Sequence, residues 1–171
     1  LDEDNKWQRS RFNTHYAISK FRAEQEVWRS MAEGLNAAVV NPAVILGSGR
    51  WDEGALGLFG LVWDGFPFYP KGATGFVDVR DTARFMIRLM ESPVSGQRFV
   101  LSADNWSYRQ LLTEIARHLD RRPPRRPMPR LLRSAAWRWE WLRSRFTGNR
   151  PLITRETAAN AARTFYFDNQ R

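Results

Sequence analysis

Tyr16 and Lys20 are four residues apart, a spacing that can support proton transfer. On a helix, side chains at positions i and i+4 lie one turn apart on the same face. The lysine ammonium would then lie close to the tyrosine oxygen and stabilise the phenolate. Such a tyrosine can pass a proton to or from a substrate hydroxyl or carbonyl. The alternative is that the two residues meet by chance on a solvated helix face.

The composition makes the lysine at position 20 informative. The chain has 27 basic Lys and Arg residues, and only Lys6, Lys20 and Lys71 are lysines. Random placement of these lysines and the tyrosines gives on the order of 0.07 Tyr-x-x-x-Lys pairs. Arginine is a poor substitute for a compact ammonium because its charge is spread over a planar fork. The retained lysine therefore favours a functional role.

A helix must position this pair. Asn13 or Thr14 can cap its first turn, and Gly34 is suited to end it after about Glu33. Between these ends the apolar residues recur at helical rather than alternating spacing. They are Ile18, Phe21, Val27, Trp28 and Met31. Tyr16 is thus expected in the first turn and Lys20 in the second.

A buried strand is expected to follow the helix. Residues 37–40 are continuously apolar, Asn41 and Pro42 interrupt them, and residues 43–46 are apolar again. Such a run predicts a strand covered on both faces, as in a parallel sheet between helices. Gly47, Ser48 and Gly49 would form the loop at its carboxyl end, where ligands of open α/β sheets bind.

The remaining elements alternate between helix and strand. Helices are predicted at 54–64, at 82–91 with Asp81 as cap, at 107–119 with a capping box between Ser107 and Gln110, at 130–146, and after Thr154 to about 163. Extended segments are predicted at 68–70, 75–79, 97–102, 121–129 and 165–167.

Three motifs occur in a fixed order: the Tyr16/Lys20 pair, the segment NPAVILG at 41–47, and FVDVRD at 76–81. This order resembles the C-terminal half of the extended short-chain dehydrogenases/reductases, the NAD-dependent epimerase/dehydratase superfamily, and most closely their dihydroflavonol-reductase-like branch. The resemblance covers about 13–169. It implies an α/β fold, with the C-terminal part of a Rossmann-type parallel sheet and a smaller α/β substrate-binding lobe.

The resemblance also implies a division of the chain. Residues 1–48 would complete the dinucleotide-binding domain, and 49–171 would form mainly the substrate-binding lobe. Residues 76–103 would partly return to the Rossmann sheet. The chain has one G-x-x-G-x-x-G match, at 54–60, but it lies well after the Tyr16/Lys20 helix and not after a first strand, where a pyrophosphate turn is needed. It is therefore expected to be a fragment that lacks the N-terminal half, exposes an apolar sheet edge and is inactive alone.

Roles for individual residues follow from the same resemblance. Tyr16 would be the general acid/base, and Lys20 would promote its ionisation and bind the nicotinamide ribose. The implied cofactor contacts are Tyr16, Lys20, Asn41, Pro42, Ala43 and Val44. The implied substrate contacts are Gly47, Ser48, Arg50, Trp51 and Arg80, although Ser48 stands where the family usually has proline.

Two classes of function fit these residues. The first is an oxidoreductase or epimerase that uses NAD or NADP on a small carbonyl or hydroxyl compound or a nucleotide sugar. The second is a dinucleotide-binding or regulatory protein with a degenerate dehydrogenase fold. The intact Tyr16/Lys20 pair favours the enzyme. The choice between NAD and NADP depends on a residue after the second Rossmann strand, in the missing half.

Composition excludes several other classes. The chain has no cysteine, only two histidines and no apolar run of about 20 residues, so neither a metal site nor a membrane span is expected. Eleven arginines between Arg117 and Arg150 would suit nucleic acid, an anionic membrane or a charged cofactor. Without a nucleic-acid motif, a solvated basic face is the favoured interpretation. A cytoplasmic protein with a small-molecule substrate, no nucleic-acid partner and scope for a homodimer is expected.

A last cluster is aromatic. Trp137, Trp139 and Trp141 alternate along the predicted helix at 130–146, so they cannot share one helix face. They would either pack in the substrate-binding lobe with cation–π contacts or bind a membrane surface or partner. Packing is the favoured interpretation.

Overall fold

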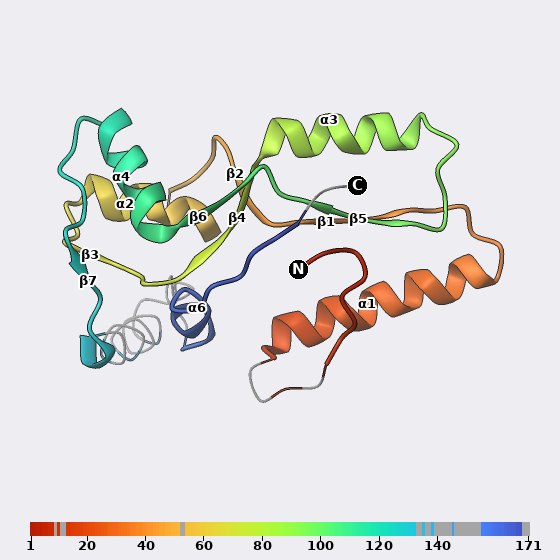
Figure 1. Cartoon of the computed structure of the whole chain (residues 1–171), viewed down its shortest axis with the longest axis horizontal. Coiled ribbons are helices and arrows are strands. Elements are labelled where there is room, and N and C mark those ends of the chain that lie inside the picture. The colour runs from red at the N-terminus through yellow and green to blue at the C-terminus, as the bar shows by residue number, and fades with distance from the viewer. Residues whose placement is uncertain are drawn as a thin grey trace.

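The computed structural model describes residues 1–8, 10, 13–51, 54–132, 135, 138, 145 and 155–168. Its elements are α1 (His15–Ala32), β1 (Val39–Pro42), β2 (Val44–Leu46), η1 (Gly54–Leu56), α2 (Gly57–Trp63), β3 (Phe68–Tyr69), β4 (Ala73–Asp78), α3 (Val79–Met90), β5 (Arg98–Leu101), β6 (Asp104–Ser107), α4 (Tyr108–His118), β7 (Arg126–Pro127) and α6 (Arg155–Asn160). The fold is α/β, with parallel strands and covering helices (Figure 1). The predicted helix at 130–146 and its three tryptophans lie largely outside the described residues.

Two groups of elements lie at opposite ends of the molecule (Figure 1). One end carries α1, α3 and the parallel pair β1–β5. The other end carries α2, α4 and the small parallel pair β3–β7. The sheet β2-β4-β6 lies between them and is mixed, because β2 is parallel to β4 and β6 is antiparallel to it. The division into domains at residue 48 stays a prediction.

The segment predicted as one strand over 37–46 forms two strands in different sheets. β1 pairs with β5, and after a bend at Ala43 the chain continues as β2, which pairs with β4. Pro42 has no amide hydrogen and fixes its own φ, so a ladder weakens at this point. The bend places the expected cofactor contacts where the chain passes from one sheet to the next.

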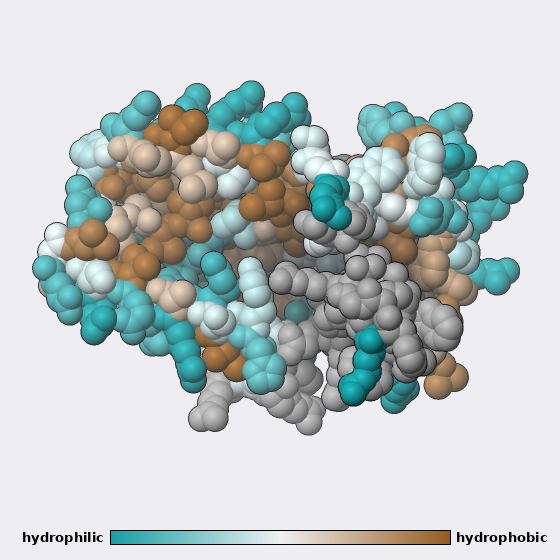
Figure 2. Space-filling model, turned by 180° about the vertical axis from the view of Figure 1, so that it is seen from behind, coloured by the Kyte–Doolittle hydropathy of each residue, from teal (hydrophilic) through white to brown (hydrophobic). Residues whose placement is uncertain are grey.

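Burial of this strand is also less than predicted. All four residues of β1 are half-buried, and α1 has no fully buried residue. Within the described part of the chain, β1 has a neighbouring strand on one side only. Apolar surface gathers over this end of the molecule, at the left of Figure 2, and includes Met86, Ile87 and Met90 of α3.

Helix starts follow local capping rules, with one correction. Thr14 caps α1 by accepting a hydrogen bond from the Ala17 amide at 3.0 Å. Ser107 and Gln110 form the predicted capping box of α4. Helix α3, however, begins at Val79 with Asp78 as its cap, so Asp81 lies in the first turn and is not the cap. Asp78 takes this role because its extended backbone leaves its carboxylate free to accept from the amide two residues on.

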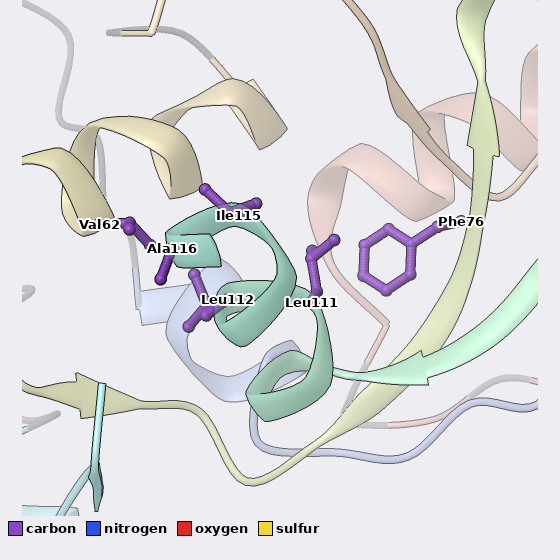
Figure 3. Packing of buried hydrophobic residues seen from close by; sticks show 6 residues of the cluster. All are labelled: Val62, Phe76, Leu111, Leu112, Ile115 and Ala116. Atoms are coloured by element: carbon purple, nitrogen blue, oxygen red, sulfur yellow. The ribbon is translucent and has the colours of Figure 1, made fainter. Parts of the chain in front are cut away.

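The core lies between α2, α4 and β4. Leu111, Leu112 and Ile115 of α4 point toward Val62 of α2 and Phe76 of β4, and Ala116 lets α2 approach closely (Figure 3). These side chains are almost completely buried. The i, i+3, i+4 spacing along α4 explains why this helix joins the two layers.

The C-terminal segment does not form the predicted strand at 165–167. It contacts β4 through a single parallel bridge between Ala73 and Thr164 and then continues without regular structure. The Phe165 amide donates to the Ala73 carbonyl at 2.9 Å. Among the described residues, no helix is long and apolar enough to cross a membrane.

Glu24 joins α1 to the pair β1–β5. Its carboxylate accepts hydrogen bonds from the Trp28 indole at 3.1 Å, the Asn41 amide at 3.2 Å and the Arg98 guanidinium at 3.2 Å. The ion pair with Arg98 is largely shielded from solvent. A carboxylate with three donors on three elements fixes how the helix lies on the sheet.

Glu24→Ala should therefore lower the free energy of unfolding by about 2–3 kcal/mol, because three partly buried donors lose their charged acceptor. Urea unfolding of the full-length protein checks this, read from the midpoint at unchanged slope. Glu26→Ala is the matched control on the same helix, since Glu26 makes only an exposed ion pair with Arg29. It should cost less than about 0.5 kcal/mol. Equal costs for the two variants would contradict the assignment.

Candidate active site

Tyr16 and Lys20 occupy the first two turns of α1, as predicted. The Tyr16 side chain is 73% exposed, and Lys20 is also exposed. A phenol in this position is accessible to a ligand rather than committed to the core. The proton-transfer role of the pair stays a prediction.

A cavity of about 1530 Å³ lies beside Tyr16. Its described walls come from η1 and α2, β3, the start of α4, the segment 127–130, and α6 with the residues that follow it. Ligand pockets of drug-sized molecules usually measure about 300–1,000 Å³, so this cavity has room for a large ligand.

Three of the predicted site residues line the same cavity: Tyr16, Val44 and Trp51. They come from α1, β2 and the loop that precedes η1, so the fold brings together residues far apart in the sequence. The other predicted site residues are not among its described lining. Those residues are Lys20, Asn41, Pro42, Ala43, Gly47, Ser48, Arg50 and Arg80.

Several of these other residues have structural contacts of their own. The Asn41 amide is bound to Glu24, and the Ala43 amide donates to the Leu101 carbonyl at 2.8 Å. Gly47 lies so close to the side chain of Val79 that a Cβ there would clash. These contacts fix the backbone around the bend between β1 and β2. Cofactor and substrate contacts by these residues stay predictions.

The C-terminal wall of the cavity is held to β4 by its backbone. The Gly72 amide donates to the Ala161 carbonyl and the Ala73 amide to the Arg163 carbonyl, both at 3.1 Å. A Cβ at Gly72 would clash with both of these carbonyl oxygens. Glycine is therefore required here for close approach of two backbones. This approach places Ala158, Ala161 and Ala162 along the cavity.

Arg80, expected beside the substrate, forms an ion pair with Asp78. Its Nε and one terminal nitrogen donate to the two carboxylate oxygens at 2.9 and 2.6 Å. The side-chain and backbone hydrogen bonds of Arg80 lower the pKa of Asp78 from 3.8 to about 2. The pair lies at the junction of β4 and α3, where it reinforces the helix cap.

The Asp78 pKa is directly testable. Because the pKa in the folded protein lies below the ordinary value, the carboxylate stabilises the fold at pH above about 4 and this contribution is lost as the pH falls toward 2. Carboxyl NMR titration should give an Asp78 midpoint near 2, and Arg80→Gln should raise it toward 3.8. Arg84→Gln is the control and should shift it much less, since Arg84 is the weakest contributor. An unchanged midpoint in Arg80→Gln would refute the pairing.

Sequence reasoning missed all the other described lining residues, and two of them matter most for binding. Tyr108, at the start of α4, lines the cavity, and burial raises the pKa of its phenol, so it presents a neutral hydroxyl. Trp63, at the end of α2, packs edge to face on Trp51 with ring centroids 6.0 Å apart. The guanidinium of Arg121 lies 4.1 Å from the Trp63 ring centroid. No short motif signals either residue, because only the folded chain brings them to the cavity.

Comparison with known proteins gives two curated relatives, whereas no family model matches. The chain is 26% identical over 136 residues to sterol demethylase protein B of Methylococcus capsulatus, which covers 78% of this chain and 42% of that protein. It is 29% identical over 127 residues to tetraketide alpha-pyrone reductase 1 of Arabidopsis thaliana, covering 70% and 37%. The chain thus spans less than half the length of these relatives.

Solved structures share the fold. The structure of gox2253 has a TM-score of 0.73 at 27% identity, with 98% of this chain and 52% of that chain covered. PA4631, a nucleoside-diphosphate-sugar epimerase from Pseudomonas aeruginosa, has a TM-score of 0.68 at 17% identity, with 94% and 58% covered. MoeE5 in complex with UDP-glucuronic acid and NAD has a TM-score of 0.65 at 16% identity, with 99% and 50% covered.

These likenesses agree with the order of motifs in the chain. The helix with Tyr16 and Lys20 precedes the strand at 39–42, and the motif at 76–81 spans the end of β4 and the start of α3. This chain covers 42% of the length of sterol demethylase protein B and 52% of the length of the gox2253 chain. The chain therefore resembles reductases and epimerases of the short-chain dehydrogenase type in the order of its motifs and in its fold, and it covers about half of their length or less.

Proposed function

We propose that the protein to which this chain belongs is an NAD(P)-dependent oxidoreductase or epimerase that interconverts an alcohol and a carbonyl compound. The observation that carries the proposal is the position of Tyr16. An exposed phenol lies one helical turn from a lysine and lines a cavity large enough for a substrate. A tyrosine needed only for packing would not be 73% exposed there.

In the direction of reduction, the Tyr16 hydroxyl donates its proton to the substrate oxygen as the carbonyl becomes an alcohol. In the reverse direction the phenolate accepts that proton. Lys20, one turn along α1, favours the phenolate by its positive charge. When bound, NAD(P) would supply or accept the hydride at the substrate carbon, so that proton and hydride transfer together balance the reaction.

The residues of this chain fit the nicotinamide end of such a cofactor. At Ala43, directly after the carboxyl end of β1, the chain bends and passes from the sheet with β5 to the sheet with β4. Val44, the next residue, lines the same cavity as Tyr16. Asn41 to Val44 would hold the nicotinamide by backbone contacts, with Lys20 at its ribose. The one G-x-x-G-x-x-G match of the chain, at 54–60, forms η1 and α2 and does not follow a first Rossmann strand, so these residues would make only part of the cofactor site.

The test is cofactor binding and turnover by the full-length protein. NADH and NADPH are titrated by fluorescence, and carbonyl compounds and nucleotide sugars are screened for turnover, with wild type beside Tyr16→Phe. We expect both proteins to bind one nucleotide and only the wild type to turn over. If neither nucleotide binds, the proposal fails. If the nucleotide binds but no substrate turns over, a dinucleotide-binding protein without dehydrogenase activity is the better description.

A further inference from the structure

We infer that the cavity binds a bulky, mainly apolar alcohol or ketone, such as a polycyclic or fused aromatic compound, rather than a nucleotide sugar. The inference rests on the proposed function only for the reacting group, since the argument for the bulk of the ligand comes from the cavity walls. It goes further by choosing between the two substrate classes that the proposed reaction allows.

The described walls are overwhelmingly apolar. Apart from glycine, the lining residues of α2 and η1 are alanine, leucine, tryptophan and one aspartate at the helix end, and β3 adds phenylalanine. Pro127, Met128 and Pro129, which begin at β7 beside β3, also line the cavity. Methionine and proline surfaces suit an apolar ligand of irregular shape because they present few hydrogen-bonding groups.

Polar groups suited to a nucleotide sugar are scarce. Among the described lining residues there is no Asn, Gln, Ser, Thr or His, and the charged ones are Asp64, Lys71 and Arg130. These three are exposed, so they lie toward the rim. A base, two riboses or sugars and a diphosphate would leave most of their polar groups without partners in such walls. The apolar body of a ketone or alcohol has no hydrogen bonds to lose on entering.

The two phenol hydroxyls of the described lining match what a ketone or alcohol requires. Tyr16 is the proposed acid/base, and Tyr108 belongs to the core side of the cavity, next to Phe76. A hydrophobic pocket with a few placed polar groups is the usual form of a site for an apolar ligand. The ligand would then be oriented by its one or two oxygen atoms.

An aromatic wall offers the principal contact surface. Trp51 packs edge to face on Trp63 and also contacts Phe59 with centroids 6.0 Å apart. Yet Trp51 and Trp63 remain 40% and 48% exposed, and both line the cavity. Arg121 stacks on Trp63 and restrains its ring. Restrained, half-exposed indoles bind flat apolar rings with little loss of side-chain freedom.

The experiment measures binding to the full-length protein, by calorimetry, of androstenedione, acetonaphthone and UDP-glucose, each with and without saturating cofactor. We expect at least one of the two ketones to bind at least tenfold more tightly than UDP-glucose. Trp63→Ala should weaken ketone binding about tenfold. Trp7→Ala is the matched control, because Trp7 is similarly exposed at 39% but stacks on Phe21 and is not among the described lining of the cavity.

A second variant guards against a folding defect in Trp63→Ala. Ala162→Trp adds a large side chain to the C-terminal wall of the cavity and leaves Trp51 and Trp63 unchanged, so it should also weaken ketone binding at least tenfold. Tighter binding of UDP-glucose than of either ketone, or ketone binding unaffected by both variants, would overturn the inference, as would failure of both ketones to bind. The proposed function is judged separately. Turnover of a nucleotide sugar would support the proposed function and refute the inference. Ketone binding without any turnover would support the inference and refute the proposed function.

Discussion

Tyr16→Phe should lower kcat of the full-length enzyme by about 10²- to 10⁴-fold, the usual range for loss of a positioned general acid/base. Phenylalanine keeps the ring and removes only the hydroxyl that exchanges the proton. The affinity for NAD(P)H should change less than threefold, because the ring and the neighbouring backbone remain. Steady-state kinetics with the screened substrate, together with fluorescence titration of the nucleotide, separate these two effects.

The control for this variant is Tyr166→Phe. Tyr166 is an exposed tyrosine in the C-terminal segment and is not among the described residues of the cavity wall. Its loss should leave kcat unchanged. A Tyr16→Phe enzyme with more than one tenth of wild-type kcat would show that another group moves the proton.

Lys20 extends the same argument. If its ammonium favours the phenolate, Lys20→Met should lower kcat and, when the reductive reaction is measured, shift the alkaline side of the pH–rate profile upward. Lys20→Arg should restore less than full activity, because a guanidinium cannot reproduce a compact charge. Lys6→Met, which removes an exposed lysine outside the described cavity wall, is the comparison variant. A purely structural role for Lys20 would change stability without moving the pH profile.

Local signals predicted the elements that depend on neighbours in the sequence. The cap at Thr14, the stop near Gly34 and the capping box at Ser107 all involve groups within a few residues. The start of α3 was misplaced because Asp78 and Asp81 are both suitable caps, and only the backbone at Asp78 is extended. The antiparallel strand β6 was missed, since its residues Asp104–Ser107 lack an apolar pattern and owe their conformation to pairing with β4.

The cavity depended on contacts that no local pattern contains. The Tyr16/Lys20 pair could be read from its spacing, but its wall partners lie far along the chain. Trp63 reaches the cavity because α2 packs on α4, and Ala162 because the backbone after α6 docks at Gly72. The chain likewise bends at Ala43 because the two parts of one apolar run pair with different strands, residues 39–42 with β5 and residues 44–46 with β4. Such long-range contacts determine which residues line the cavity, and neither composition nor local spacing predicts them.

The packing of α4 leads to the second large effect, because α4 both fills the core and supports the cavity. Leu112→Ala should lower the free energy of unfolding by about 3–4 kcal/mol, within the range for truncating a buried leucine. Leu112 is only 1% exposed and packs between α2 and β4, so its removal leaves a void that the glycine-rich helix α2 would have to fill by moving (Figure 3). Urea unfolding of the full-length protein measures the change.

Leu35→Ala is the control for this substitution, since Leu35 is 52% exposed in the turn after α1. Its cost should stay within about 0.5 kcal/mol, as for most surface changes. Because Leu112 also lines the cavity, its truncation should weaken ligand binding along with stability. A cost of less than about 1 kcal/mol for Leu112→Ala would show that α4 does not support the cavity. It would then also count against a rigid aromatic wall, on which the substrate inference depends.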